Sequence, residues 1–521
     1  MCSTMSLIQD TLGQLDLSIL LLGLVALLMT YVYVTRPRNL PPGPWSLPIV
    51  GNLPTLTLAK GNIHHTFNKW RKKYGAIVFF KIGTLNAVCL NDYDVIKEAY
   101  VNRSDMFGNR PTNLRIVNEL FNQKGILSAP LGPHWRERRK FARGRLGFGN
   151  RGIENKVLEE ASNMQSELLK TKSKSFNIKR MLQQAATNVV CSMVFGKRWD
   201  YENQTFQALM KSLDVLFRSG FFFIPENIFP YVPGFLRRGH KVKANVENIL
   251  EHVRAEIKEH KETFNREDVR DFIDAFLLEM QSRPNTENGS FTETQLEITV
   301  LDLFLAGTET VSTTLWWACL LLILNPDIQH KVQGEIEEVL GREGRPSMAQ
   351  RPQMPYTAAT VAEIQRYRAA SNIGIPHAVP RDTSFYGSKP CVYIDVPMSV
   401  KELLIFLNRY TIPKDTIIFG GQWPVHHDPE RFPEPEKFDP DRFICSDGKF
   451  KKNEYFMPFS MGSRSCLGKP LAEVEVFLLF TFLFQRFGFE LPKGTDRPSA
   501  EGVMGITLAP MPYELVAIPR D

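Results

Sequence analysis

The stretch Phe459-Ser-Met-Gly462-Ser-Arg464-Ser-Cys466-Leu-Gly468 decides how this chain folds. It presents one cysteine on a loop bounded by glycines, directly before an apolar run, Leu471 to Phe484, that is expected to be helical. A thiol at a helix N-terminus ionises more easily, because the helix dipole and the free N–H groups of the first turn stabilise a thiolate. We therefore expect Cys466 to be an anionic ligand.

The other residues of this loop suit a flat, carboxylate-bearing cofactor. Gly462 and Gly468 allow a sharp turn and a close approach, and Arg464 supplies a positive charge for a carboxylate. With Phe459 they give the pattern Phe-x-x-Gly-x-Arg-x-Cys-x-Gly, which resembles the haem-ligand signature of the cytochrome P-450 family. The resemblance implies haem b with Cys466 as its thiolate ligand. The alternative, a buried structural cysteine, does not explain five matching positions.

Size, composition and charge allow a large enzyme of a reducing compartment. The chain has 521 residues, 43% of them hydrophobic, and its seven cysteines are scattered and odd in number, which argues against a disulfide framework. The net charge of +7 is modest, and no basic and aromatic stripe indicates nucleic-acid binding. A basic patch for a membrane surface or an acidic protein partner stays open.

The N-terminus is expected to be a membrane anchor. Residues 17–34 are almost continuously apolar and free of charge, about the length that spans a bilayer as a helix. Arg36 and Arg38 follow, so the positive-inside rule places the rest of the chain in the cytosol. We expect a signal anchor over residues 1–35 and a haem-binding catalytic domain over 36–521. The resemblance to animal microsomal, family-two-like members implies a single-pass protein of the endoplasmic reticulum membrane.

Periodicity predicts a fold that is mainly α with small β-sheets. Alternating β-branched and apolar residues between Tyr74 and Asn91 indicate a hairpin, and most of the chain after this hairpin is helical in pattern. We find no repeat and no long linker, which favours one large soluble domain. The resemblance implies the cytochrome P-450 fold.

The segment Ala306-Gly307-Thr308-Glu309-Thr310 lies in an apolar run that suits a buried helix. Ala306 and Thr310 share a face, so the Thr310 hydroxyl can donate back to the Ala306 carbonyl and leave a groove beside the Glu309 carboxylate. Gly307 is costly in a helix, which indicates a close backbone approach or a distortion. A hydroxyl beside an acid can pass protons to a ligand. The segment resembles the oxygen-binding stretch of the P-450 central helix, which implies a catalytic role.

Three charged residues are expected to form a lock behind the cysteine loop. Glu363 and Arg366 are three apart on one helix face and can pair, and Arg442 offers a second guanidinium. They match the family's Glu-x-x-Arg helix and its following Pro-x-Arg-Phe segment. We take Arg442 as the partner rather than Arg431 of the similar string Pro429-Glu-Arg-Phe432.

Further matches imply cofactor and partner contacts. Trp135 and Arg139 match the Trp-x-x-x-Arg helix that reaches a haem propionate, and His377 is a further expected propionate contact. A basic face is predicted around that helix and the cysteine loop, with Arg136, Arg138, Lys140, Arg143, Lys451, Lys452 and Lys469. It would dock an acidic NADPH-dependent flavoprotein reductase, with a cytochrome b-type protein as a second donor.

One segment departs from the family pattern. Members run from a stretch like His377–Gly387 directly into one like Tyr410-Thr-Ile-Pro-Lys, whereas here residues 388–409 intervene. The extra segment therefore interrupts a predicted hairpin. Either it is a surface excursion, which a hairpin tip tolerates, or it is translated intron retained in the gene. Its apolar content favours the second interpretation.

These features together predict a membrane-bound haem-thiolate monooxygenase. It would insert one oxygen atom of O2 into a lipophilic substrate such as a fatty acid, a steroid or a foreign compound. The alternative from another class is a haem protein that binds or senses a ligand without catalysis, or a paralogue inactivated by the extra segment. The sequence does not distinguish among the substrate classes.

Overall fold

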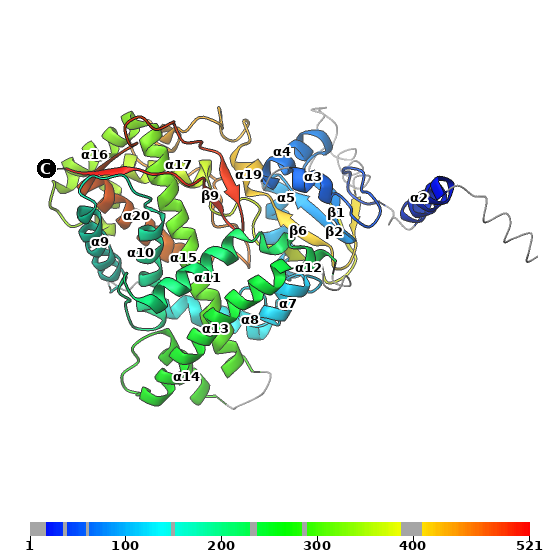
Figure 1. Cartoon of the computed structure of the whole chain (residues 1–521), viewed down its shortest axis with the longest axis horizontal. Helices are drawn as coiled ribbons and strands as arrows, with labels where there is room; N and C mark the ends of the chain where they lie inside the picture. The colour runs from blue at the N-terminus through cyan, green and yellow to red at the C-terminus, as the bar shows by residue number, and fades with distance from the viewer. Residues whose placement is uncertain are drawn as a thin grey trace, which may run out of the picture.

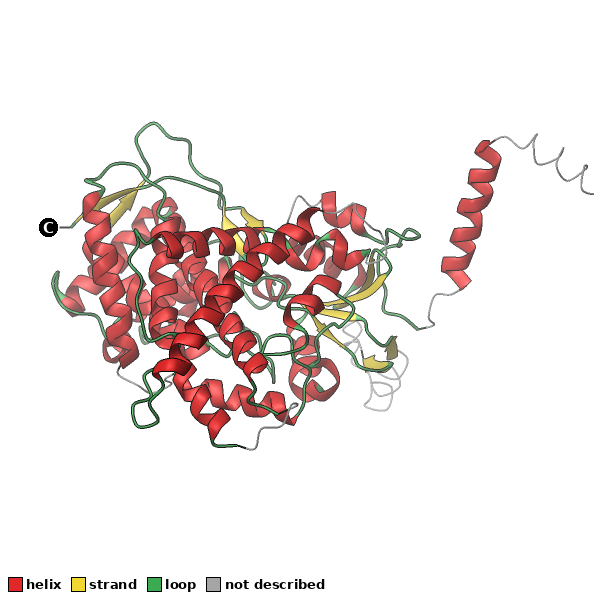
Figure 2. Ribbon diagram, turned by 60° about the horizontal axis from the view of Figure 1, so that its bottom comes forward, coloured by secondary structure: helices red, strands yellow, loops and turns green. Residues whose placement is uncertain are grey.

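The computed structural model describes residues 17–34, 39–58, 62–146, 152–229, 237–283, 289–386 and 409–520. These residues are mainly helical with small sheets, as the sequence predicts (Figure 2). The helices are α2 (Leu17–Val34), α3 (Leu53–Leu58), α4 (Ile63–Tyr74), α5 (Tyr93–Lys97), α6 (Ser104–Phe107), α7 (Arg115–Phe121), α8 (Pro133–Arg145), α9 (Gly152–Lys170), α10 (Lys179–Val194), α11 (Gln204–Arg218), α12 (Pro225–Ile228), α13 (Arg237–Thr263), α14 (Phe272–Gln281), α15 (Glu293–Leu324), α16 (Pro326–Leu340), α17 (Pro355–Tyr367), α19 (Gln422–His426) and α20 (Lys469–Arg486). Short helical turns are η1 (Glu98–Asn102), η2 (Phe221–Phe223), η3 (Met348–Gln353) and η4 (Pro440–Phe443).

The strands form small sheets at the edges of the helical body. They are β1 (Ile77–Ile82), β2 (Leu85–Leu90), β3 (His377–Ala378), β4 (Thr383–Tyr386), β5 (Arg409–Ile412), β6 (Ile417–Gly420), β7 (Phe487–Glu490), β8 (Gly502–Met504), β9 (Leu508–Pro510) and β10 (Val516–Pro519). The predicted hairpin is confirmed, because β1 and β2 pair antiparallel. A four-stranded sheet has the order β1-β2-β6-β3, with β6 parallel to β2. Segments that are more than 300 residues apart in the sequence, β2 and β6, are therefore neighbours in this sheet.

The apolar N-terminal run forms α2, which stands apart from the rest of the protein (Figure 1). Its side chains, such as Ile19, Leu22 and Leu27, are exposed, unlike those of a core helix. Among the described residues, one helix meets the length and hydropathy expected of a membrane span, and it is α15, whose apolar window is 78% buried inside the protein. Burial of that extent is typical of the core helix of a soluble domain, so α15 is not expected to span a membrane. The role of α2 as a membrane anchor stays a prediction.

The atypical segment connects two strands, β4 and β5, that pair with each other as a hairpin. Strands β4 and β5 pair antiparallel, with Phe385 opposite Tyr410 and Tyr386 opposite Arg409. If residues 388–409 were deleted, Tyr386 and Gly387 would form a two-residue turn between the paired Phe385 and Tyr410, a common hairpin length. The predicted location at a hairpin tip is therefore confirmed, although residues 387–408 lie outside the described residues.

Helix α15 runs through the centre of the protein, beside α10, α11 and α13 (Figure 1). Its second half belongs to an apolar cluster with α9, α10, α16, α17 and α20, and its first half to another with α7, α11, α13 and α14. Residues such as Trp317, Leu320 and Leu301 are fully enclosed. Burial on all sides explains why the whole run is apolar rather than amphipathic.

Gly307 allows α15 to pack closely on α10. A Cβ atom built at this position would lie 2.5 Å from Cγ2 of Val190 on α10. The helix is continuous from Glu293 to Leu324, so the glycine meets the expected need for close approach and not for a break in the helix.

This contact gives a testable prediction. Gly307→Ala should lower the free energy of unfolding by about 1–3 kcal/mol, because overpacking outweighs the gain in helix propensity. The loss should shrink in the Gly307→Ala/Val190→Ala double variant, measured by chemical unfolding as a double-mutant cycle. Additive losses would contradict the contact.

Candidate functional site

The cysteine loop is closed by backbone contacts and fixed against η1. The Cys466 N–H donates to the Phe459 carbonyl at 2.9 Å. Gly462 has φ +76°, and a Cβ there would lie 1.7 Å from the Tyr100 carbonyl oxygen, so only glycine fits this turn. Helix α20 begins at Lys469, which places Cys466 just before its first turn, as predicted.

The Cys466 thiol meets the requirements of a thiolate ligand. Burial raises its pKa, but the backbone N–H groups of Gly468 and Lys469 and the charge of Arg139 favour the ionised form. The Cys466 side chain is exposed, so a ligand can reach its sulfur. Burial also raises the pKa of the thiols of Cys89, Cys191 and Cys319, and of these three Cys191 has a cationic side chain, Lys197, that favours the ionised form.

Arg464 is turned inward from the loop. Its guanidinium donates to the carbonyls of Gly108, Ile126 and Ala129, and it lies 4.2 Å from the Trp135 ring centre. These contacts tie the cysteine loop to residues 125–129 and to α8. The predicted contact of Arg464 with a cofactor carboxylate stays a prediction.

The other residues predicted to hold the cofactor gather at the same place. Arg139 on α8 donates to the Ser465 carbonyl, so α8 touches the cysteine loop. Trp135 is buried and donates its indole N–H to the Ile126 carbonyl at 2.9 Å. His377 is buried and stacks on Tyr100 at 4.1 Å, with Nδ1 against the Phe107 carbonyl.

Arg110 lies in the same group of buried residues, and the sequence analysis missed it. Its guanidinium contacts the carbonyls of Leu127, Ile375 and Pro376. Burial and the neighbouring Arg110 and Arg139 lower the pKa of Arg464 to about 8, and burial lowers the pKa of Arg110 to about 10. A lone arginine before a proline carries no motif signal, so only the fold could identify it.

This cluster fits the two propionates of a haem. Arg110, Arg139 and Arg464 are like charges enclosed together, and among the described residues Asp302 is the acid that acts on both Arg110 and Arg464. Buried guanidinium groups favour anionic partners, and a dianionic cofactor supplies two carboxylates. The residues around Cys466 therefore fit haem.

Replacement of Arg110 tests this fit. Arg110→Gln should speed haem transfer from the holoprotein to apomyoglobin about tenfold or more, because a charge-assisted hydrogen bond contributes about 1.5–3 kcal/mol. Arg103→Gln is the control, since Arg103 also donates to a backbone carbonyl, that of Ser384, but is not in the cluster. Equal transfer rates for the two variants would contradict a propionate contact.

The groove on α15 is confirmed in part. The Thr310 hydroxyl donates to the Ala306 carbonyl at 2.8 Å, as predicted. Ala306 is exposed in the middle of an otherwise buried helix, and Thr310 is partly exposed on the same face. A small residue and a hydroxyl thus line accessible space within the core.

Glu309 does not line this groove beside Thr310. It is 3% exposed, and its Oε2 accepts a hydrogen bond from Gln183 of α10 at 3.1 Å. Successive helical residues point about 100° apart, so Glu309 faces α10 while Thr310 shares the accessible face of Ala306. Burial raises the pKa of Glu309 to about 7, so this carboxyl can exchange a proton near neutral pH.

The predicted charge lock is present. Arg366 contacts Glu363 through two hydrogen bonds, at 2.6 and 2.8 Å, and Arg442 of η4 contacts Glu363 at 3.1 Å. Glu363 and Arg366 are fully buried. Arg431 contacts Tyr455 and Asp94 instead, so Arg442 is the correct partner.

Breaking this cluster should destabilise the protein. Arg366→Leu should lower the free energy of unfolding by about 3–5 kcal/mol, because it removes two hydrogen bonds from the buried Glu363 carboxylate and leaves Arg442 as its cationic partner. Arg431→Leu is the matched control and should cost less than about 1 kcal/mol, since its ion pair is partly exposed. Similar losses in urea unfolding would contradict the distinction.

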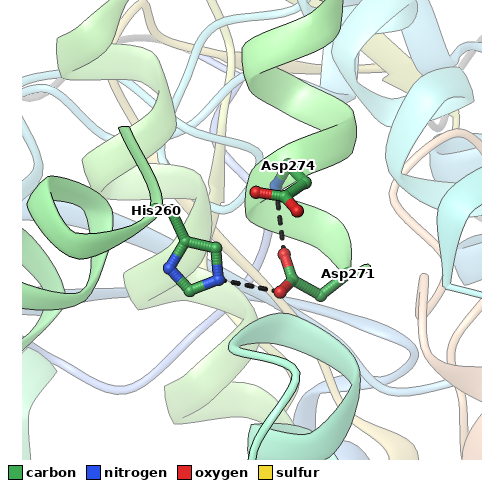
Figure 3. A group of neighbouring side chains, drawn as sticks. All are labelled: His260, Asp271 and Asp274. Atoms are coloured by element: carbon green, nitrogen blue, oxygen red, sulfur yellow. Dashed lines mark hydrogen bonds and ion pairs between the residues drawn. The ribbon is translucent and has the colours of Figure 1, made fainter. Parts of the chain in front are cut away.

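A separate acidic group, His260, Asp271 and Asp274, lies on α13 and at the start of α14 (Figure 3). Burial alone would lower the pKa of His260, but its hydrogen bond with Asp271 at 2.8 Å raises it overall. Asp274 is held by Arg270 through two hydrogen bonds, and Asp271 caps α14 by accepting from the Asp274 N–H. These contacts make the group a junction between two helices.

The fold, the thiol at a helix N-terminus and the cationic cluster define a haem-thiolate protein. A comparison with protein families agrees: the model of the family "Cytochrome P450" matches residues 41–394 and 388–517. The chain belongs to the cytochrome P450 family and is a haem-thiolate monooxygenase whose cofactor is protoporphyrin IX haem held by a cysteine thiolate. The two matched parts meet within the atypical segment, where the chain departs from the family pattern.

Similar curated proteins are family-two cytochromes P450 of animals, which confirms the predicted type. Cytochrome P450 2J2 of Homo sapiens is 36% identical over 510 residues, covering 96% of each chain. Cytochrome P450 2U1 of Homo sapiens is 34% identical over 532 residues, covering 96% of this chain and 93% of the relative. Cytochrome P450 2H2 of Gallus gallus is 38% identical over 489 residues, covering 92% and 94%. The similarity indicates association with the endoplasmic reticulum membrane.

Proposed function

We propose that Cys466 is the thiolate that holds the haem iron for oxygen insertion into a lipophilic substrate. The observation that carries this assignment is the position of its sulfur, which faces the N–H groups of Gly468 and Lys469 beside the charge of Arg139. When bound, haem activates O2 with two electrons, so that one oxygen atom enters the substrate and the other leaves as water.

The remaining residues orient the cofactor and manage protons. Arg110, Arg139 and Arg464 hold the propionates, with Trp135 and His377 packed between them. Ala306 and Thr310 would line a small polar groove for oxygen and substrate. Phe459, Gly462 and Gly468 shape the loop that carries the ligand, and Glu363, Arg366 and Arg442 fix the segments behind it.

A basic surface near the cysteine loop supports docking of an acidic electron donor. Arg136, Lys140 and Arg143 are exposed on α8, the helix that touches the loop. Arg138 does not belong to this surface, because it is buried and donates to the Gly125 carbonyl. The donor is an NADPH-dependent flavoprotein reductase, with a cytochrome b-type protein as a second source of electrons.

The membrane arrangement is part of the same proposal. The exposed apolar side chains of α2 support a single-pass anchor over residues 1–35, with residues 36–521 forming one catalytic domain on the cytosolic side. A lipophilic substrate dissolved in the bilayer would then reach the enzyme directly.

The reduced carbon monoxide complex tests the ligand assignment. The wild-type protein should show the absorption band of a thiolate-bound haem and should oxidise substrates with NADPH and a reductase. Cys466→Ala should lose both, because no anionic sulfur remains at the iron.

Cys445→Ala is the matched control and should keep the band, since Cys445 is partly exposed and follows η4. A thiolate band in Cys466→Ala would refute the assignment. A thiolate band without any turnover in the wild type would favour the ligand-binding or sensing alternative over the enzyme.

A further inference from the structure

The imidazole of His260 has a hydrogen-bond acceptor at each of its ring nitrogens. Its Nδ1 lies 2.8 Å from the Glu256 carbonyl oxygen. Its Nε2 lies 2.8 Å from Oδ2 of Asp271, as Figure 3 shows. A carbonyl and a carboxylate only accept hydrogen bonds, so both ring nitrogens must carry a proton. An imidazole is a stronger base than a carboxylate, so the shared proton belongs to the ring, and His260 is an imidazolium in this arrangement.

This ion pair is enclosed by protein. The side chain of His260 is 6% exposed and that of Asp271 is 1% exposed. The backbone packs closely on the carboxylate, because a Cβ atom built at Gly196 would lie 2.7 Å from Oδ2 of Asp271. A buried charge that loses its partner is strongly destabilising. Loss of the His260 proton would therefore leave the Asp271 carboxylate against a bare nitrogen lone pair, which is an unfavourable contact.

The pair connects the end of one helix to the start of the next. His260 lies in the last turn of α13, and Asp271 is the N-cap of α14. The Asp271 side chain accepts a hydrogen bond from the Asp274 N–H at 3.0 Å through the oxygen that does not face His260. Helices α13 and α14 both pack against α15. The protonation of one imidazole is thereby linked to the cap of α14 and to its attachment to α13.

The other charged groups around this pair have partners of their own. They are Asp274, which is held by Arg270; Glu256, which pairs with Lys197 after α10; and Lys156 of α9, which donates to the Ser192 carbonyl and also acts on Asp271. Burial lowers the pKa of His260, but Asp271, the Glu256 carbonyl and Asp274 outweigh it, so the pKa lies above 6.5. The folded protein therefore keeps this proton at a pH where an open chain would lose it.

We propose that the ion pair of His260 with Asp271 is a pH-sensitive latch between α13 and α14, which closes when His260 is charged and opens when His260 loses its proton. This device goes beyond the proposed oxygen insertion and does not depend on it. Because the pKa of His260 is raised in the folded protein, the stabilisation is fully present below pH 6.5 and is lost as the pH rises through the folded-state value. The competing explanation is a hydrogen bond that holds the helices together equally at every pH.

Hydrogen–deuterium exchange at the imidazole C2 position, read by mass spectrometry, gives the titration midpoint of His260 in the full-length holoprotein. In the wild type this midpoint should lie above 6.5. Asp271→Asn should lower it, because asparagine still caps α14 but no longer carries the charge. His330→Gln is the control, because His330 is exposed on α16 and its loss should leave the His260 midpoint unchanged.

Amide hydrogen exchange at the start of α14 measures the opening of the latch in the same protein, after correction for the intrinsic dependence of exchange on pH. Proton linkage ties the two measurements together. Each unit by which the His260 midpoint exceeds 6.5 should make opening about tenfold more frequent above the midpoint than below pH 6.5. In Asp271→Asn the smaller midpoint shift should give a smaller increase in opening. The amides of the β1–β2 hairpin, which lies outside the junction, should show no such increase.

Three results would overturn the latch. One is a wild-type His260 midpoint at or below 6.5. Another is opening of α14 that stays constant with pH while His260 titrates, which is what the purely structural hydrogen bond predicts. The third is a midpoint that Asp271→Asn leaves unchanged. If Asp271→Asn does not fold, the wild-type protein alone still decides, because the midpoint shift and the increase in opening must agree through the tenfold relation.

Discussion

The burial of Arg464 is the constraint on which the rest of the site depends. Its guanidinium offers only hydrogen-bond donors, so the protein must surround it with acceptors, and these are the carbonyls of Gly108, Ile126 and Ala129. The same segment is held by Asp302 of α15, which accepts from the N–H groups of Ile126 and Leu127. One short piece of backbone therefore fixes the distance between the central helix, α8 and the cysteine loop.

The two sides of α15 have different surroundings. Ala306 and Thr310 lie on a face of this helix that is accessible to solvent. Glu309 faces the opposite direction, into contact with Gln183. A helix offers this separation at no cost in chain length, because neighbouring residues point in different directions.

Sequence reasoning predicted those parts of the site that depend on local spacing. Cys466 precedes a helix, Glu363 and Arg366 share a face, and Thr310 reaches back one turn to Ala306, all of which follow from helix geometry. It missed Arg110 and the inward turn of Arg138, and it placed Glu309 in the groove. These features depend on contacts with residues far away in the chain, such as the 126 positions between Gln183 and Glu309, and no periodicity encodes them.

The pairing of β4 with β5 has a consequence for how this protein tolerates change. Because the cross-strand partners close the hairpin by themselves, the length of chain between Tyr386 and Arg409 adds only a slowly growing entropy of closure. The tip of this hairpin is thus a site that tolerates insertions. Gene segments of different lengths, or a fluorescent reporter grafted there, can be carried without altering the spacing between the cysteine loop and the central helix.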